Sequence, residues 1–250
     1  MTMISEIDEI FRTRVVKDKF GNKFALRANV DRHEGEALFG LIASDTTIKK
    51  TLEVGCAYGV SSLHICSALS SRNSPRHVIV DPCQYTEFRG IGVLNLERAG
   101  FQFFDLIELP SEFALPELAR KGAGTFDLVF IDGWHTFDHT LLDLFYANLL
   151  VRVGGYIVVD DCNMAPVSKA VLYLSQYPSY EVVRVTRRRP TTWKQLVKQV
   201  VSTLVPPVVA RNMLPHICYD NYYVRTIFPS MVFLHKVAED KRDWNWFRAF

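Results

Sequence analysis

The chain has 250 residues, 48% of them hydrophobic, and a formal net charge of +2. A chain of this size and composition can bury a large core as one domain, or as one domain with an appended cap. Because the charge is nearly balanced, it gives no indication of nucleic acid as a partner. The N-terminal residues carry acids where a signal peptide needs a basic start and an apolar core, and no stretch approaches the roughly 18 apolar residues of a membrane span. We therefore expect a cytoplasmic protein without a transmembrane segment, and the five cysteines, which form no C-x-x-C pair, agree with a reducing compartment.

Short runs rich in β-branched or aromatic residues alternate along the chain with segments of helical periodicity. The predicted strands are residues 50–54, 77–81, 103–109, 126–132, 155–161, 180–185 and 230–237. The predicted helices are residues 60–70, 88–99, 111–121, 136–150 and 165–177, where apolar residues recur every three or four positions. This order predicts an α/β fold with a doubly wound, mostly parallel seven-stranded sheet covered by helices on both faces.

Two segments lie outside this alternation. Residues 1–49 precede the first strand, and we expect them to form an N-terminal helical cover. Residues 186–229 contain RRRP and VPPVV and are too long for an ordinary connection, so we interpret them as an inserted cap or as a contact in a homo-oligomer. The predicted catalytic domain comprises residues 50–185 and 230–238.

The first predicted strand runs into EVGCAYGVSS, which places Glu53, Gly55, Gly59 and Ser61 where strand turns to helix. Glycines permit a tight turn and a close ligand, and the helix N-terminus offers free N–H groups. The second strand ends in Asp81, a carboxylate that can accept from both hydroxyls of a ribose. An adenosine ligand is the functional interpretation of this pattern, and a turn that merely packs a helix is the structural one.

These segments resemble a known family, the class I S-adenosylmethionine-dependent methyltransferases, whose first motif is (E/D)-x-G-x-x-x-G. The resemblance rests on LEVGCAYGVSSLHI, VDP, FDLVFIDGWHTFDHTLLDL and LLVRVGGYIVVDD, and it covers about residues 50–177. Within the family, these segments look most like the metal-dependent branch, which contains catechol-type and antibiotic-sugar O-methyltransferases. It implies a Rossmann-like methyltransferase fold with S-adenosylmethionine as cofactor. The residues that it assigns to the cofactor are Glu53 in the motif, Gly55, Ala57, Gly59 and Ser61 at the methionine end, Asp81 at the ribose, and Ser111 or Trp134 beside the adenine.

Acids follow two of the predicted strands. Asp132 ends residues 126–132, and Asp160 with Asp161 ends residues 155–161; these strands are neighbours in this type of sheet. Three converging carboxylates suit a hard divalent ion such as Mg²⁺, and in the resembling family the third ligand is commonly Asn or Asp. The alternative is that Asp132 and Asp161 cap the helices that follow.

His135 lies three residues after Asp132, at the position where the resembling enzymes have a Lys or His that takes the proton of the acceptor hydroxyl. An imidazole is matched to proton transfer near neutral pH, so we predict His135 and Asp132 as the catalytic residues. The alternative is a surface histidine in the first turn of a helix. A zinc site on His135 and His139 is disfavoured because HTFDH lacks the Glu of the H-E-x-x-H motif.

The resulting prediction is an enzyme: an S-adenosylmethionine-dependent, Mg²⁺-dependent O-methyltransferase acting on a hydroxyl of a small molecule or sugar. Two alternatives stay open. One is a metal-independent N-methyl or aminopropyl transferase, and the other is a non-catalytic S-adenosylmethionine-binding scaffold subunit.

Overall fold

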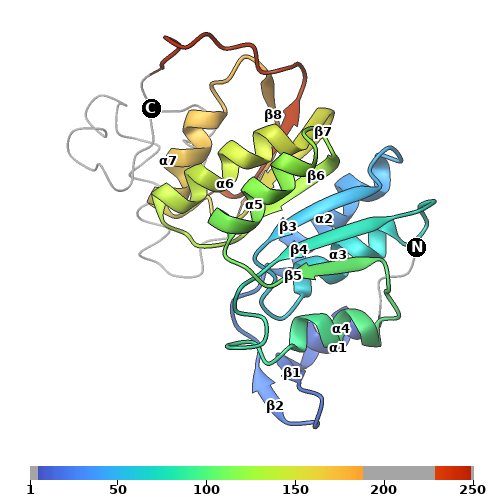
Figure 1. Cartoon of the computed structure of the whole chain (residues 1–250). Helices are drawn as coiled ribbons and strands as arrows, with labels where there is room; N and C mark the ends of the chain where they lie inside the picture. The colour runs from blue at the N-terminus through green and yellow to red at the C-terminus, as the bar shows by residue number, and fades with distance from the viewer. Residues whose placement is uncertain (1–4, 188–228, 249–250) are drawn as a thin grey trace.

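A seven-stranded sheet forms the centre of the molecule, in the order β5-β4-β3-β6-β7-β9-β8 (Figure 1). The structure is a computed structural model that describes residues 5–187 and 229–248. The strands are β3 (Lys50–Val54), β4 (Arg76–Val80), β5 (Phe104–Ile107), β6 (Phe126–Ile131), β7 (Val151–Val159), β8 (Tyr180–Arg187) and β9 (Pro229–Lys236). The first five strands in this order from β5 to β7 are parallel, and β9 is antiparallel to both of its neighbours. The predicted doubly wound, mostly parallel sheet is confirmed.

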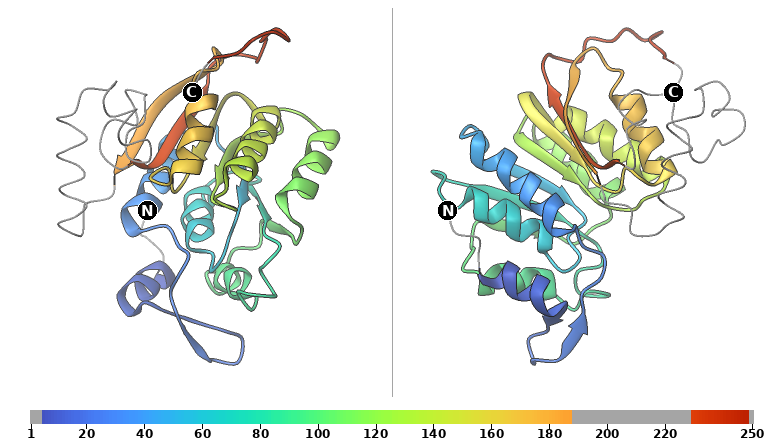
Figure 2. Two further views of the ribbon diagram at one scale, coloured as in Figure 1. Left: turned by 90° about the vertical axis from the view of Figure 1, so that its left-hand side faces the viewer. Right: turned by 180° about the vertical axis from the view of Figure 1, so that it is seen from behind.

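Helices cover both faces of this sheet (Figures 1 and 2). One face packs against α1 (Ser5–Thr13), α2 (Arg32–Ser44), α3 (Val60–Leu69) and α4 (Ile91–Arg98). The other packs against α5 (Ser111–Lys121), α6 (Phe137–Leu150) and α7 (Ala165–Leu174). The five predicted helices correspond to α3, α4, α5, α6 and α7.

The central strand β6 shows why the sheet needs both helix layers. Leu128 and Phe130 are buried in the core on the α3 side, whereas Val129 and Ile131 are buried in the core on the α6 side. Alternate side chains of a strand point to opposite faces, so the run Leu128–Ile131, which is apolar at every position, requires cover on both faces. This is the reason that FDLVFI lacks the alternating pattern of a half-exposed strand.

The N-terminal segment contains α1 and α2, but also a hairpin of β1 (Val15–Lys17) and β2 (Lys23–Ala25) that was not predicted. These strands have three residues each, which is too short for a period of two to be recognised. The start of α2 is set by a capping box: Asp31 accepts a hydrogen bond from the backbone N–H of Glu34 (2.8 Å), and Glu34 accepts one from that of Asp31 (2.6 Å).

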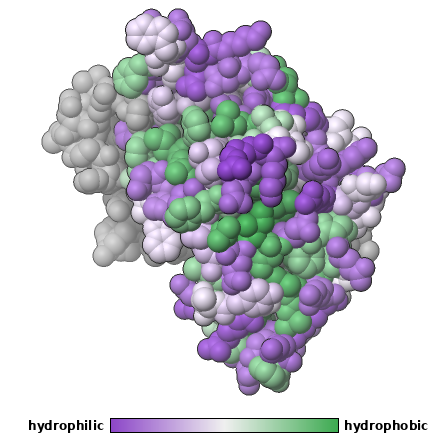
Figure 3. Space-filling view, in the orientation of Figure 1, coloured by the Kyte–Doolittle hydropathy of each residue, from purple (hydrophilic) through white to green (hydrophobic). Residues whose placement is uncertain are grey.

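Most of the predicted cap, residues 186–229, falls outside the described residues, so its role and the homo-oligomer stay predictions. Residues at its two borders are described: the hydroxyl of Thr186, at its start, is 2.9 Å from that of Ser230, which directly follows it, and the carbonyl of Ser230 accepts from the N–H of Cys162. No helix in residues 5–187 and 229–248 has both the length and the apolar character needed to cross a membrane. On the face seen in Figure 3, hydrophobic residues gather near the middle of the molecule, among more polar surroundings.

Candidate active site

A cavity of about 570 Å³ lies at the carboxyl ends of the parallel strands. Ligands of open α/β sheets bind at this edge, where the connections between strands and helices meet. Nine of the twelve predicted site residues line the cavity: Gly55, Ala57, Asp81, Ser111, Asp132, Trp134, His135, Asp160 and Asp161. Glu53, Gly59 and Ser61 are not among its lining residues.

The turn after β3 approaches the end of β6 very closely at Gly55. Gly55 has a φ of 87°, in the left-handed region that favours glycine. A Cβ there would lie 2.7 Å from the carbonyl carbon of Asp132, and closer still to its oxygen. Only glycine fits this position. Because it has no side chain, the backbone carbonyl of Asp132 can lie directly against the turn.

Asp81 at the end of β4 holds the same turn from the other side. Its Oδ2 accepts from the backbone N–H groups of Cys56 (3.0 Å) and Ala57 (2.9 Å), and its Oδ1 accepts from that of Cys83 (2.8 Å). The carboxylate is 3% exposed and lines the cavity. Asp81 therefore shapes the turn through its backbone hydrogen bonds, and contact with a ribose stays a prediction.

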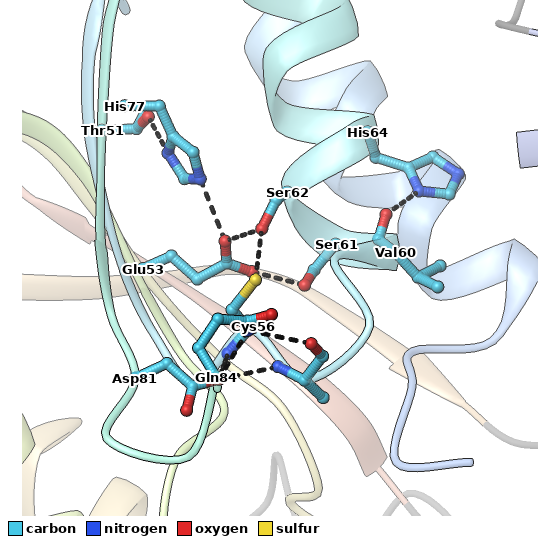
Figure 4. A network of polar contacts seen from close by, with 11 residues as sticks. Thr51, Glu53, Cys56, Val60, Ser61, Ser62, His64, His77, Asp81 and Gln84 are labelled. Atoms are coloured by element: carbon cyan, nitrogen blue, oxygen red, sulfur yellow. Dashed lines mark hydrogen bonds and ion pairs between the residues drawn. The ribbon is translucent and has the colours of Figure 1, made fainter. Parts of the chain in front are cut away.

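Glu53 lies behind the turn in a buried polar network (Figure 4). Its carboxylate accepts from the hydroxyls of Ser61 and Ser62 and is 3.0 Å from Nε2 of His77. The other ring nitrogen of His77 is 2.8 Å from the hydroxyl of Thr51. This network fixes the first turn of α3 to β3 and β4, so Glu53 and Ser61 support the turn from beneath. Their direct contact with a cofactor stays a prediction.

An acidic cluster occupies the part of the cavity between β6 and β7. We use this name for Asp132, His135 and Asp161, each of which offers an atom within 4.8 Å of the others. Nε2 of His135 is 3.2 Å from Oδ1 of Asp132 and 3.4 Å from Oδ2 of Asp161. The predicted convergence of acids from two neighbouring strands is present, with His135 between them.

Asp160, the remaining predicted metal ligand, lies deeper than the acidic cluster. It is 3% exposed, and its Oδ1 accepts from the backbone N–H of Asp161 (2.8 Å). Asp161 follows with a φ of 50°, a left-handed conformation that Asp tolerates better than most residues. The two successive acids therefore differ: Asp160 supports the turn, and Asp161 is the nearer neighbour of His135.

Burial and crowding dominate the electrostatics of these groups. Burial raises the pKa of Asp132 to about 6, although the hydrogen bond from His135 opposes it. Burial, and next the charge of Asp132, raises the pKa of Asp160 well above its ordinary value. The hydrogen bond to Asp132 raises the pKa of His135. Clustered carboxylates that resist ionisation are stabilised by a cation, and two carboxylates with an imidazole form a donor set that fits a divalent metal ion.

Some lining residues were not predicted. Glu112 at the start of α5 and His139 on α6 both line the cavity, and Nδ1 of His139 is 2.8 Å from the hydroxyl of Thr136. His139 is not part of the acidic cluster. The sequence places His139 one helical turn beyond His135, but spacing alone did not distinguish a lining residue from a metal ligand.

The comparisons with known proteins agree with this geometry. Residues 52–162 match a family described as a methyltransferase domain. The chain carries a methyltransferase domain. This match agrees with the resemblance of the sequence to the class I methyltransferases, and the predicted Rossmann-like methyltransferase fold is confirmed.

Solved structures support the same fold. The chain is similar to cofactor-bound Rv0187 from MTB (18% identity, TM-score 0.58, covering 84% of this chain and 83% of that one). It is also similar to the O-methyltransferase TomG from Streptomyces achromogenes, solved in complex with SAM (18% identity, TM-score 0.57, covering 84% of this chain and 82% of that one). A third similar structure is that of an O-methyltransferase from Bacillus cereus in complex with SAH (19% identity, TM-score 0.57, covering 75% of this chain and 86% of that one). No curated protein matches the chain.

Proposed function

We propose that this methyltransferase uses S-adenosylmethionine to methylate a hydroxyl group of a small molecule or sugar, with the help of a divalent cation. The observation that carries the proposal is the position of the acidic cluster in the same cavity as the Gly55 turn and Asp81. Two of the similar proteins named above are O-methyltransferases with bound SAM or SAH. A cavity of about 570 Å³ is in the range of sites that hold small molecules.

The lining residues suggest how the cofactor lies. Gly55 and Ala57 would face its methionine end, and Asp81 its ribose. Ser111 and Trp134, which is 67% exposed, would flank its adenine. The sulfonium would then lie between the turn and the acidic cluster, where negative charge favours a positively charged group.

The reaction is an in-line displacement. The acceptor oxygen forms a bond to the methyl carbon as the bond from that carbon to sulfur breaks, and S-adenosylhomocysteine leaves with the electron pair. His135 takes the hydroxyl proton, as in general base catalysis. An imidazole that donates through Nε2 to Asp132 presents an unprotonated Nδ1, which is the form that can accept a proton.

A divalent cation would be held by Asp132 and Asp161, with Asp160 adjacent. Such a cation would lower the pKa of the acceptor hydroxyl, so that His135 could remove the proton more easily near neutral pH. Oxygen ligands favour Mg²⁺, and an imidazole ligand would favour a transition metal.

A second candidate is methyl transfer without a metal. The observation that favours it is the hydrogen bond between the side chains of His135 and Asp132, with 3.2 Å between Nε2 and Oδ1. Such a pair can act as a general base alone, because the carboxylate orients the imidazole and stabilises its charged form.

The test is calorimetry followed by turnover. We expect S-adenosylmethionine to bind the purified protein, and a panel of hydroxylated acceptors to yield S-adenosylhomocysteine in the presence of Mg²⁺. EDTA should stop turnover and added Mg²⁺ should restore it, whereas unchanged turnover in EDTA would favour the metal-independent reaction.

His135→Ala should lower kcat by roughly 10²–10⁴-fold. His139→Ala removes the other lining histidine of this segment and should affect kcat much less. Failure to bind S-adenosylmethionine would contradict the proposal as a whole.

A further inference from the structure

His77 is a buried histidine that the reaction above does not use. It lies near the start of β4, and its side chain is fully buried. It is not among the residues that line the cavity. A buried imidazole has lost its hydrogen bonds with water, so its two ring nitrogens need partners within the protein.

Both ring nitrogens of His77 find these partners on β3, the neighbouring strand (Figure 4). Nε2 is 3.0 Å from Oε2 of Glu53, and Nδ1 is 2.8 Å from the hydroxyl of Thr51. A carboxylate accepts hydrogen bonds, so Nε2 is the donor in the first contact. Thr51 and His77 are also paired in the register of the two strands. The ring is therefore held on both sides, and it holds Glu53 in one orientation.

Glu53 connects this ring to α3. Its carboxylate accepts from the hydroxyls of Ser61 and Ser62, which lie in the first turn of the helix. The N-cap residue, Gly59, has no side chain that could form a capping hydrogen bond. The start of α3 is therefore fixed from beneath by one carboxylate, whose orientation depends on His77.

Ser62 connects the same carboxylate to the turn that would hold the cofactor. Its hydroxyl is 3.4 Å from Sγ of Cys56, a residue of the turn that lines the cavity. Serine hydroxyls near a helix start otherwise bond readily to nearby backbone groups. Because Glu53 engages both hydroxyls, they do not compete for the backbone N–H groups of this first turn, which favour the negatively charged end of a ligand.

We propose that His77 is a positioning residue for the turn of residues 55–59, that it acts through Glu53, and that it sets the affinity for the amino acid end of the cofactor. This inference rests on the proposed binding of S-adenosylmethionine with its methionine end at this turn. It adds a determinant of affinity that lies outside the cavity and touches no ligand.

The test compares two ligands that share the adenosine and the sulfur. S-adenosylhomocysteine carries the amino acid end, and 5′-methylthioadenosine carries a methyl group in its place. We expect His77→Leu to weaken binding of the first ligand by roughly 10–100-fold in calorimetry, the range expected when one buried hydrogen bond to a charged group is lost. Binding of the second ligand should weaken by less than about 3-fold, because it lacks the end that the turn would hold.

Two amides of different length separate the hydrogen bond to Glu53 from mere occupancy of the site. The side-chain nitrogen of His77→Gln can take the place of Nε2 and donate to Glu53, so this variant should keep most of the affinity for S-adenosylhomocysteine. The amide of His77→Asn reaches only the position of Nδ1, beside Thr51, so this variant should lose affinity as His77→Leu does. If His77→Leu does not fold, the two amide variants decide the result.

Val78→Ala is the matched control for a loss of stability. Val78 is the next residue of β4, but it is buried in the core on the α6 side and does not line the cavity. The lost packing should lower the midpoint of urea denaturation, while the affinities for both ligands stay at their wild-type values.

The possible failures are distinguishable. A wild-type protein that binds neither ligand overturns the proposed function together with this inference. If the wild type binds S-adenosylhomocysteine and folded His77→Asn binds it equally well, the role of His77 alone is overturned. The same holds if His77→Asn loses affinity for both ligands by the same factor, since the effect is then general damage to the cavity.

Discussion

The α-carbon of Gly55 lies against the backbone carbonyl of Asp132, at a point where no side chain can be accommodated. This contact joins the turn that would hold the cofactor to the strand end that carries the acidic cluster. The two parts of the candidate site are therefore positioned by backbone against backbone, which is less adaptable than a contact between side chains.

Gly55→Ala should consequently damage both parts at once. The new methyl group overlaps the Asp132 carbonyl, and alanine is strained at a φ of 87°. We expect a loss of several kcal/mol in the free energy of unfolding, measured by urea denaturation, and loss of S-adenosylmethionine binding. The control is Gly40→Ala on α2, where a Cβ would meet nothing within 4 Å. That change should be neutral or stabilise the protein by up to about 1 kcal/mol. Two variants of equal stability would show that the close approach is not required.

Asp81 offers a second test, in which turn geometry and ligand contact are separated. Asp81→Ala removes the acceptor for three backbone N–H groups, so we expect a loss of about 1–3 kcal/mol in unfolding free energy as well as weaker cofactor binding. Asp81→Asn keeps one carbonyl oxygen and should retain more of the stability. Because a neutral amide is a poorer partner for ribose hydroxyls, calorimetry should still show binding weakened roughly 10-fold. The matched control is Asp105→Asn on β5, whose side chain is 57% exposed. Normal affinity in a folded Asp81→Asn variant would remove the ribose from the role of Asp81.

The fold was largely predictable because its strands are buried on both faces. Short runs rich in β-branched or aromatic residues, such as the predicted strands at residues 50–54 and 126–132, identified β3 and β6 almost to the residue. β7 begins at Val151, earlier than predicted, because Gly154 and Gly155 suggested a turn where the strand continues. The hairpin of β1 and β2 was missed because three residues do not define a period.

The candidate site was predictable only where topology determines it. Neighbouring parallel strands bring Asp132 and Asp161 to one edge, so their approach followed from the order of the strands. The sequence did not show that Glu53 would lie behind the turn, because the side chain of a strand residue can point to either face of the sheet. It also gave no signal for the burial of Asp143 on α6, which is 1% exposed, since an acid on a helix is usually expected to face solvent.

Replacement of one acid beside the acidic cluster distinguishes metal binding from a purely structural role. Asp160→Asn preserves shape and can still accept from the N–H of Asp161, so we expect the protein to fold and bind S-adenosylmethionine. If the acids hold a divalent cation, the loss of one charge should abolish methyl transfer, and titration calorimetry should show weaker binding of Mg²⁺ itself. Under the alternative in which the acids only cap or support turns, turnover should barely change, because Asn caps about as well as Asp. Asp127→Asn is a control at the opposite end of the sheet, where the carboxylate accepts from the N–H of Lys49 and Lys50.

Asp143 makes a prediction about stability that does not depend on any ligand. Its pKa is raised from 3.8 to about 6 in the folded protein, chiefly by burial, with Ser111, His139 and Glu112 as the neighbouring groups that modify it. A raised pKa means that the fold favours the protonated acid, so the stability of the wild type falls as the pH rises from about 4 to about 6 and then levels off. Asp143→Asn does not titrate. Its stability relative to the wild type should therefore increase over this range, by up to about 3 kcal/mol, in urea denaturation at successive pH values.

Asp138 on the same helix should behave in the opposite way. Its hydrogen bonds, first that with Thr136, lower its pKa, so its ionised form stabilises the fold. Asp138→Asn should thus lose stability relative to the wild type as the pH rises through the acid range, since the wild-type carboxylate then ionises and gains its hydrogen bonds. A pH dependence of the same sign for both variants would show that Asp143 is not a buried acid held near its protonated form, and that its carboxylate is hydrated or otherwise paired in solution.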